Sequence, residues 1–175
     1  EVAIYTVAIR LALLSTFLLQ IVNSAIAPKI ASMYKKNELN SLQLMVSRVT
    51  LGLLFIGLLI FIILLFFGKP LLLLWGSDFL DAYVILIILA FGQVINLGTG
   101  CVGLTLIMTG FEKKLAKISV IIMFLNLFLL YFLTKEFGII GAAIAASLTV
   151  IIENSLMYFY VRKYVKIKLF NFKIK

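Results

Sequence analysis

Two amide side chains lie within an apolar, glycine-rich stretch, Phe91 to Gly110. Gln93 and Asn96 are three positions apart, so a helix places both on one face, and Gly100 and Gly103 continue that face. Buried amides need hydrogen-bond partners that lipid cannot supply, and small residues let a neighbouring helix approach closely. The amides therefore favour a face that lines a cavity, whereas the glycines by themselves favour simple helix packing.

Four further polar side chains interrupt apolar runs: Arg10, Gln20, Asn126 and Glu153. Counting the helical rise from the ends of these runs predicts two layers. The outer layer holds Arg10, Gln93 and Asn96, and the inner layer holds Gln20, Asn126 and Glu153. Charges this deep are retained where they face water, substrate or a partner. Arg10 either faces a cavity or extends to the membrane surface. Glu153 is either a proton or cation site, or an acid satisfied by Gln20 or Asn126.

The residue inventory excludes several kinds of active site. The chain has no His and a single Cys, Cys101. Zinc sites that use His and catalytic triads built on His are therefore excluded within these residues. A lone thiol among apolar residues is expected to pack rather than react. The loops are short and hold no catalytic constellation, so we expect no enzyme and no cofactor.

Membrane-spanning helices must position these side chains. Of the 175 residues, 64% are hydrophobic, and the mean hydropathy is +1.21, whereas soluble domains are about half apolar. A helix needs about 20 residues to cross the hydrocarbon layer, where an open sheet edge is not tolerated. The predicted fold is all-α, a polytopic membrane bundle of about five transmembrane helices. Their expected ranges are 2–27, 49–67, 82–108, 118–133 and 139–161.

The basic residues predict the orientation of this bundle. Thirteen of the 16 Lys and Arg residues follow the first, third and fifth predicted helices. The positive-inside rule places these connections in the cytoplasm, so Glu1 is expected outside and Lys175 inside. If the whole protein begins in the cytoplasm, an odd number of further spans precedes Glu1. The formal charge of +9 marks helix ends rather than a binding face, so no nucleic acid partner is expected.

Prolines and glycines predict where the first two helices end. Pro28 is expected to stop the first helix, and Gly68-Lys69-Pro70 is expected to break the chain after the second. Residues 42–46 are expected to lie along the inner membrane surface before the second helix crosses. Residues 71–75 are expected to form an interfacial segment.

The fifth predicted helix combines small residues with an acid. Its small residues between Gly138 and Ser147 predict close contact with another helix. Helical spacing places Glu153 on one face with Ala142 and Thr149, which favours the packed or cavity side for the acid.

Four segments carry a family resemblance when their order and spacing are taken together. They are APKIASMYKKNELN (27–40), KPLLLLWGSDF (69–79), the stretch from GQVINLGTG to MTGFEKK (92–114) and EFGIIGAAIAASLT (136–149). They resemble the carboxy-terminal half of a polysaccharide (Wzx-like, O-antigen or capsule repeat-unit) flippase. That family belongs to the superfamily of MATE drug exporters and oligosaccharidyl-lipid/polysaccharide exporters. The resemblance implies two helical lobes around a central cavity with alternating access, of which this chain is one lobe without its first helix.

The resemblance also implies a cargo and a location. The cargo would be an undecaprenyl-pyrophosphate-linked oligosaccharide repeat unit, moved from the inner to the outer leaflet of a bacterial cytoplasmic membrane. The partners would be this lipid-linked oligosaccharide, membrane lipid and the N-terminal lobe of the same protein, with no metal. The candidate substrate-binding residues are Arg10, Gln20, Gln93, Asn96 and Asn126, and the candidate for a coupling ion is Glu153. Arg10 would bind the pyrophosphate, and Gln93 and Asn96 would bind sugar hydroxyls.

Two other functions fit the same helices. A MATE-like drug/cation antiporter should have buried carboxylates, and within this chain Glu153 is the one candidate. A non-transporting membrane assembly subunit would use the same small and polar residues for packing alone. Of these three functions, we expect that of a flippase rather than that of an antiporter or an assembly subunit.

Overall fold

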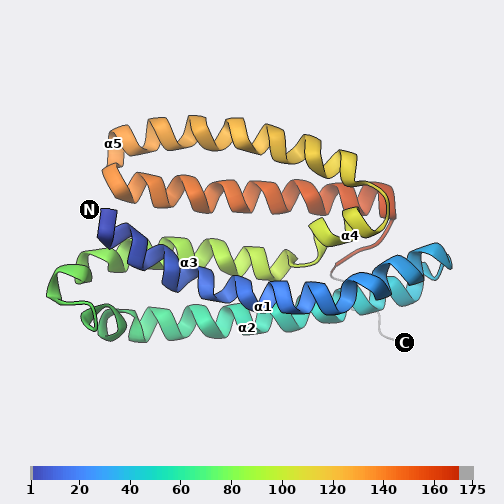
Figure 1. The fold of residues 1–175 in the computed structure, drawn as a ribbon, viewed down its shortest axis with the longest axis horizontal. Coiled ribbons are helices and arrows are strands. Elements are labelled where there is room, and N and C mark those ends of the chain that lie inside the picture. Colours follow the sequence, from blue (N-terminus) through green and yellow to red (C-terminus); the bar gives the residue numbers. More distant parts are fainter. Residues whose placement is uncertain (1, 170–175) are drawn as a thin grey trace.

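The structure, a computed structural model, describes residues 2–169 as a bundle of long helices (Figure 1). The elements are α1 (Val2–Lys35), α2 (Leu39–Leu73), the 3-10 helix η1 (Ser77–Asp81), α3 (Ala82–Thr99), α4 (Val102–Met108), α5 (Glu112–Tyr160) and the π-helix η2 (Val161–Val165). No strand occurs among the described residues. The predicted all-α membrane helix bundle is confirmed.

Four helical segments in the described part of the chain are long and apolar enough to cross a membrane: Ala3–Lys35, Leu39–Leu73, Ser77–Met108 and Glu112–Val165. The last of them is a hairpin of two helices joined at Gly138, where φ is 57° and ψ is −138°. Glycine adopts this backbone conformation more readily than other residues because it has no Cβ. Figure 1 shows the chain reversing within α5. The predicted helices 118–133 and 139–161 therefore lie in the first arm (112–137) and second arm (139–160) of α5.

Both prolines lie inside helices, so the helix ends predicted there are wrong. Helix α1 continues past Pro28 to Lys35, and α2 continues past Pro70 to Leu73. Proline removes one backbone donor, but ending a helix in the membrane would leave several backbone groups without partners in lipid. The predicted interfacial segment 71–75 is in fact the last turn of α2 and the turn that follows it.

The beginning of α2 also differs from the prediction. Leu42 and Val46 are fully buried, and they belong to a core cluster with Ile30 of α1 and Val161 of η2. Residues 42–46 therefore do not lie along the membrane surface. They begin one continuous helix, whose 35 residues extend about 50 Å and so exceed the hydrocarbon layer.

The third predicted helix, 82–108, is interrupted in its middle. Helix α3 ends at Thr99, and α4 starts at Val102 on a different course (Figure 1). The prediction that Gly100 and Gly103 extend the face of Gln93 is wrong, because the regular helix ends before them.

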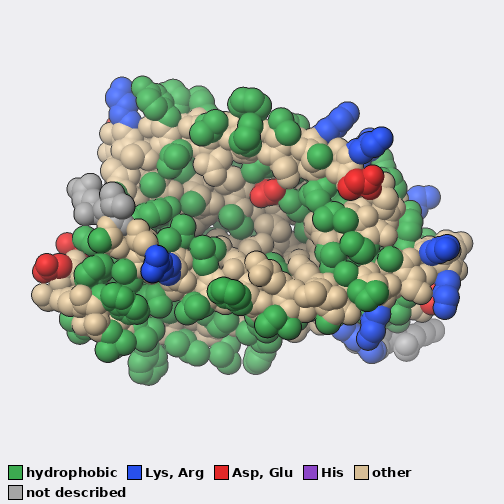
Figure 2. All heavy atoms as spheres, in the orientation of Figure 1, with side chains coloured by type: hydrophobic (Ala, Val, Ile, Leu, Met, Phe, Trp, Pro, Cys, Tyr) green, Lys and Arg blue, Asp and Glu red, His purple; other side chains and the backbone are tan. Residues whose placement is uncertain are grey.

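One end of the bundle is basic. The α1–α2 turn, the α4–α5 turn and η2 meet at this end, which we call the basic end, while η1 and the Gly138 turn lie at the other (Figure 1). Most Lys and Arg side chains in Figure 2 gather at the basic end, and hydrophobic side chains cover the length between. This is the charge segregation on which the predicted orientation rests; the orientation itself stays a prediction.

Candidate functional site

Helix α3 and the second arm of α5 cross where neither carries a large side chain. A Cβ placed on Gly92 would lie 2.9 Å from Ser147 Oγ and 3.2 Å from Ser147 Cα. Ser147 Oγ donates a hydrogen bond to the carbonyl of Ile88 at 2.7 Å. Gly141 and Ala143 of the same arm are buried. The small-residue stretch thus lets the two backbones approach closely, which brings their polar side chains together further along.

Three amides and one hydroxyl form a line of hydrogen bonds along this crossing. Asn154 Nδ2 donates to Asn96 Oδ1 at 3.4 Å and to the Val150 carbonyl at 2.9 Å. Asn96 Nδ2 donates to Gln93 Oε1 at 2.9 Å. Thr99 Oγ1 lies 2.9 Å from Asn154 Oδ1. We call Gln93, Asn96, Thr99 and Asn154 the amide chain.

The amide chain has a direction. From Asn154 through Asn96 to Gln93, each amide nitrogen donates to the oxygen of the next side chain. Aligned bonds of this kind polarise one another in a low-dielectric interior. Gln93 uses its oxygen within the chain, and its two N–H donors face no acceptor among the described residues. The chain therefore ends in a free hydrogen-bond donor.

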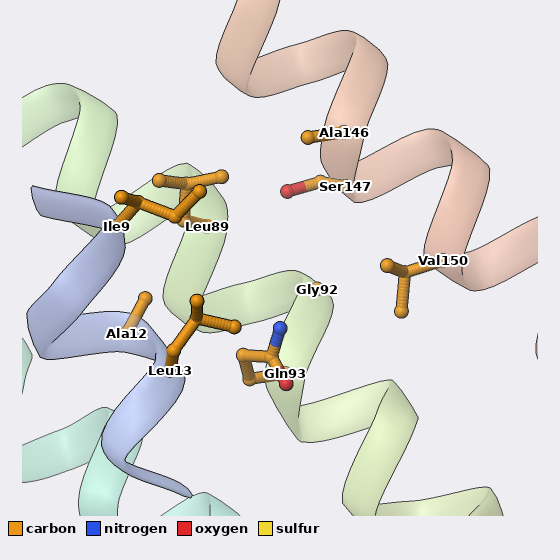
Figure 3. Close-up of a pocket in the computed structure, with 9 residues that line it drawn as sticks. All are labelled: Ile9, Ala12, Leu13, Leu89, Gly92, Gln93, Ala146, Ser147 and Val150. Atoms are coloured by element: carbon orange, nitrogen blue, oxygen red, sulfur yellow. The ribbon is translucent and has the colours of Figure 1, made fainter. Parts of the chain in front are cut away.

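The Gln93 amide lies at a cavity of about 150 Å³ between α1, α3 and the second arm of α5 (Figure 3). The lining residues are Ile9, Ala12 and Leu13 of α1, Leu89, Gly92 and Gln93 of α3, and Ala146, Ser147 and Val150 of α5. Since the Ser147 hydroxyl is already bonded to a backbone carbonyl, Gln93 supplies the free polar group of this apolar cavity.

Two predicted site residues of α1 lie outside the cavity. Arg10 and Gln20 are exposed on the bundle, and neither side chain lines the space next to Gln93. Their neighbours Leu14 and Phe17 are also exposed, at 61% and 63%. This face of α1 is thus turned away from the rest of the chain, and the roles of Arg10 and Gln20 stay predictions.

Glu153 faces the other arm of α5. Its carboxylate accepts a hydrogen bond from Ser119 Oγ at 3.4 Å, and Asn126 lies half-buried on that arm. Glu153 is thus half-buried on a packed side of this arm, while Ser147 and Asn154 of the same arm bond to α3; its role as a proton or cation site stays a prediction. Neither Gln20 nor Asn126 bonds to Glu153 in the described structure.

The predicted separation into two layers is also wrong. Asn96 of the first layer contacts Asn154, which is next to Glu153 of the second. The predicted depths of Gln93 and Asn96 assume one straight helix over 82–108. In the structure α4 departs from the axis of α3, so the distance from these residues to the basic end is shorter. Asn154 and Thr99 were therefore missed as site residues. The spacing of Ser147, Val150 and Asn154, at i, i+3 and i+7, is the signal that would have found this face.

Similar proteins support one family. The chain is 31% identical over 143 residues to the capsular polysaccharide biosynthesis protein CapF of Staphylococcus aureus, an alignment that covers 81% of this chain. It is 30% identical over 169 residues, 96% of this chain, to the probable low-salt glycan biosynthesis flippase Agl15 of Haloferax volcanii. The chain spans only 36% of the length of either relative.

No protein-family model matches the chain, and no solved structure matches it at a significant level. The Haloferax volcanii relative is named as a flippase, which is a transporter rather than an enzyme. The two relatives and the bundle of long apolar helices both indicate that the chain is related to a polysaccharide flippase-like family of membrane proteins.

Proposed function

We propose that the chain forms part of a flippase for a lipid-linked oligosaccharide, which moves this cargo between the leaflets of a cytoplasmic membrane by alternating access. One relative is named as a flippase in glycan biosynthesis, and the other is named for capsular polysaccharide biosynthesis. The cargo, the direction of movement and the cytoplasmic C-terminus belong to this proposal.

The observation that carries the proposal is the free donor of Gln93 at the apolar cavity. Sugar hydroxyls and phosphate oxygens accept hydrogen bonds, and they lose those bonds to water when they enter a membrane. A donor already polarised by Asn96 and Asn154 replaces one of these bonds without reorganising first. The lining is otherwise apolar, which fits a site that a polar group passes rather than one that holds it tightly.

The size of the cavity limits what this chain does alone. About 150 Å³ accommodates a small polar group, not a whole oligosaccharide. The exposed face of α1, with Arg10, Leu14 and Phe17, is where the remaining part of a two-lobed protein would complete a larger passage. In that arrangement Arg10 would meet the pyrophosphate, since a guanidinium pairs with phosphate oxygens.

The proposal is tested with the protein at the length of its relatives, reconstituted into liposomes. A fluorescent undecaprenyl-pyrophosphate oligosaccharide is placed in the inner leaflet, and its arrival in the outer leaflet is followed by a membrane-impermeant quencher. We expect the protein to accelerate this arrival over empty liposomes.

A second cargo separates the alternatives in the same liposomes. Export of a cationic dye driven by a proton or sodium gradient, without lipid movement, would identify an antiporter instead. Movement of neither cargo would favour an assembly subunit and contradict transport.

A further inference from the structure

The chain after η2 folds back onto the bundle instead of extending α5. Residues 166–169, which we call the strap, leave the end of α5 and cross toward α1 and α2 (Figure 1). Ile167 and Leu169 are 1% and 0% exposed, whereas Lys166 and Lys168 are exposed. This alternation is typical of an extended segment with one apolar side. The strap therefore turns its apolar side to the bundle and its lysines outward.

Two side chains of α2 hold the backbone of Lys168. Gln43 Oε1 accepts a hydrogen bond from the Lys168 N–H at 3.1 Å, and Ser47 Oγ donates one to the Lys168 carbonyl at 3.0 Å. Gln43 and Ser47 are four positions apart, so one face of α2 supplies both the acceptor and the donor. The strap needs these side chains, because no strand in the described part of the chain pairs with its backbone.

The apolar side of the strap completes the core of the basic end. Ile167 and Leu169 belong to one buried cluster with Ile30 of α1, Leu42 of α2 and Val161 of η2. Two large aliphatic side chains at this position keep water away from the cluster. The strap therefore closes the basic end over a core that several helices share.

The strap joins η2 through a backbone conformation that few residues adopt. Lys166 has φ 64° and ψ 27°, in the left-handed region. Its N–H closes the π-helix with a hydrogen bond to the Val161 carbonyl at 3.1 Å. A residue with a Cβ adopts this conformation at a cost, and contacts elsewhere must hold it there. The contacts on either side of Lys168 are those that hold it, so their loss would favour another path for the chain after η2.

We infer that the strap is a releasable closure of the basic end, which turns about Lys166 while the helices stay folded. Within the described residues, two hydrogen bonds from side chains and two apolar side chains attach it to the bundle. A segment with so few contacts opens at a lower free energy than the bundle as a whole. Its outward lysines already face water, so release exposes only the apolar side.

The release of the strap does not depend on the transport proposal, although its meaning for transport does. No residue of the strap lines the cavity next to Gln93. In the proposed flippase, the strap would close one of the two ends of the bundle between which access alternates. A strap that stays closed would leave the family and the cargo untouched and would refute this inference alone.

The test is the alkylation of a thiol placed on the strap, in the protein at the length of its relatives and in membranes. The reporter is Ile167→Cys in a Cys101→Ala background, and N-ethylmaleimide crosses membranes, so labelling does not depend on orientation. We expect labelling well below the temperature at which circular dichroism shows the helices unfolding. Labelling that appears only as the helices unfold would overturn the proposal.

Removal of one hydrogen bond should speed the release. Adding Ser47→Ala to the reporter removes the donor to the Lys168 carbonyl, and we expect labelling to be roughly tenfold faster with the helices still folded. Ser155→Ala is the matched control, since the Ser155 hydroxyl bonds to the Ile151 carbonyl of its own helix, and it should leave the rate unchanged. Equal rates for the two variants would contradict the strap.

A pair of lysine substitutions tests the turning point. Lys166→Val places a β-branched residue at a positive φ, where it is strongly disfavoured, so labelling should be several-fold faster. Lys168→Val removes the same charge from the same exposed surface, but it keeps the backbone groups that Gln43 and Ser47 bind. We expect its rate to match that of the reporter alone. Equal acceleration by both substitutions would show that charge, not the backbone at Lys166, holds the strap, and would overturn the inference.

Discussion

The amide chain and the Glu153–Ser119 contact lie on different sides of the second arm of α5, the former toward α3 and the latter toward the first arm. In the amide chain the internal oxygens are used, and the free end at Gln93 is a donor. In the Glu153–Ser119 contact a half-buried carboxylate accepts a hydrogen bond from one hydroxyl at 3.4 Å. Both occur in an apolar bundle where unpaired polar groups are costly.

The difference shows what each region is suited to meet. A free donor in an apolar cavity favours acceptor groups such as sugar hydroxyls and phosphates. A carboxylate inside a membrane helix favours a proton or a cation. The close approach of Gly92 and Ser147 separates the two regions, because it holds one face of the second arm against α3 and leaves Glu153 toward the first arm. Substitutions in the amide chain should therefore change stability and transport, whereas substitution of Glu153 should change the response of transport to pH or to a cation.

Widening the crossing should have the largest effect. In Gly92→Val the added carbons meet Ser147, so α3 and α5 must separate or shift. We expect a loss of roughly 1–3 kcal/mol in unfolding free energy and loss of transport, because the amide chain is pulled apart. Denaturant unfolding followed by Trp75 fluorescence measures the change.

Gly52→Val is the control for this substitution, since no atom lies within 4 Å of a Cβ built on Gly52. An equal loss of stability in both variants would show that the crossing is not closely packed.

Removing a member of the amide chain should cost less. Asn154→Leu leaves Asn96 Oδ1 without its donor, and an unpaired buried group costs about 1–3 kcal/mol. We expect a smaller loss of unfolding free energy than in Gly92→Val, because the backbones of α3 and α5 can stay in contact. Asn126→Leu, on the half-buried first arm, should change the unfolding free energy by less than about 0.5 kcal/mol. If the two variants unfold alike, the bonds of the amide chain do not hold α3 to α5.

The smallest effect is expected for Glu153→Gln. Glutamine still accepts a hydrogen bond from Ser119 Oγ, so folding should not change. If Glu153 is the coupling site, the dependence of transport on pH or on the driving cation should change while the maximal rate stays similar. An unchanged dependence would assign Glu153 a structural role.

Composition and periodicity were sufficient to predict the helical bundle and the polarity of Gln93 and Asn96, because these depend on local sequence. The interruption at Gly100 was not predicted, since a glycine in an apolar run fits a continuous helix equally well. At the interruption Leu53 and Leu19 pack against Gly100, which is a tertiary contact that the local sequence does not reveal. Asn154 was not predicted as a site residue, because the sequence points to the charge of Glu153 and the partner of Asn154 lies on another helix.

Leaflet translocation by Gln93→Leu tests the central claim most directly. Leucine has a similar volume but offers no donor at the cavity, so the rate for the lipid-linked oligosaccharide should fall by roughly tenfold, as loss of a hydrogen bond worth about 1.4 kcal/mol implies. An unaltered translocation rate in Gln93→Leu would contradict the role given to the donor end of the amide chain.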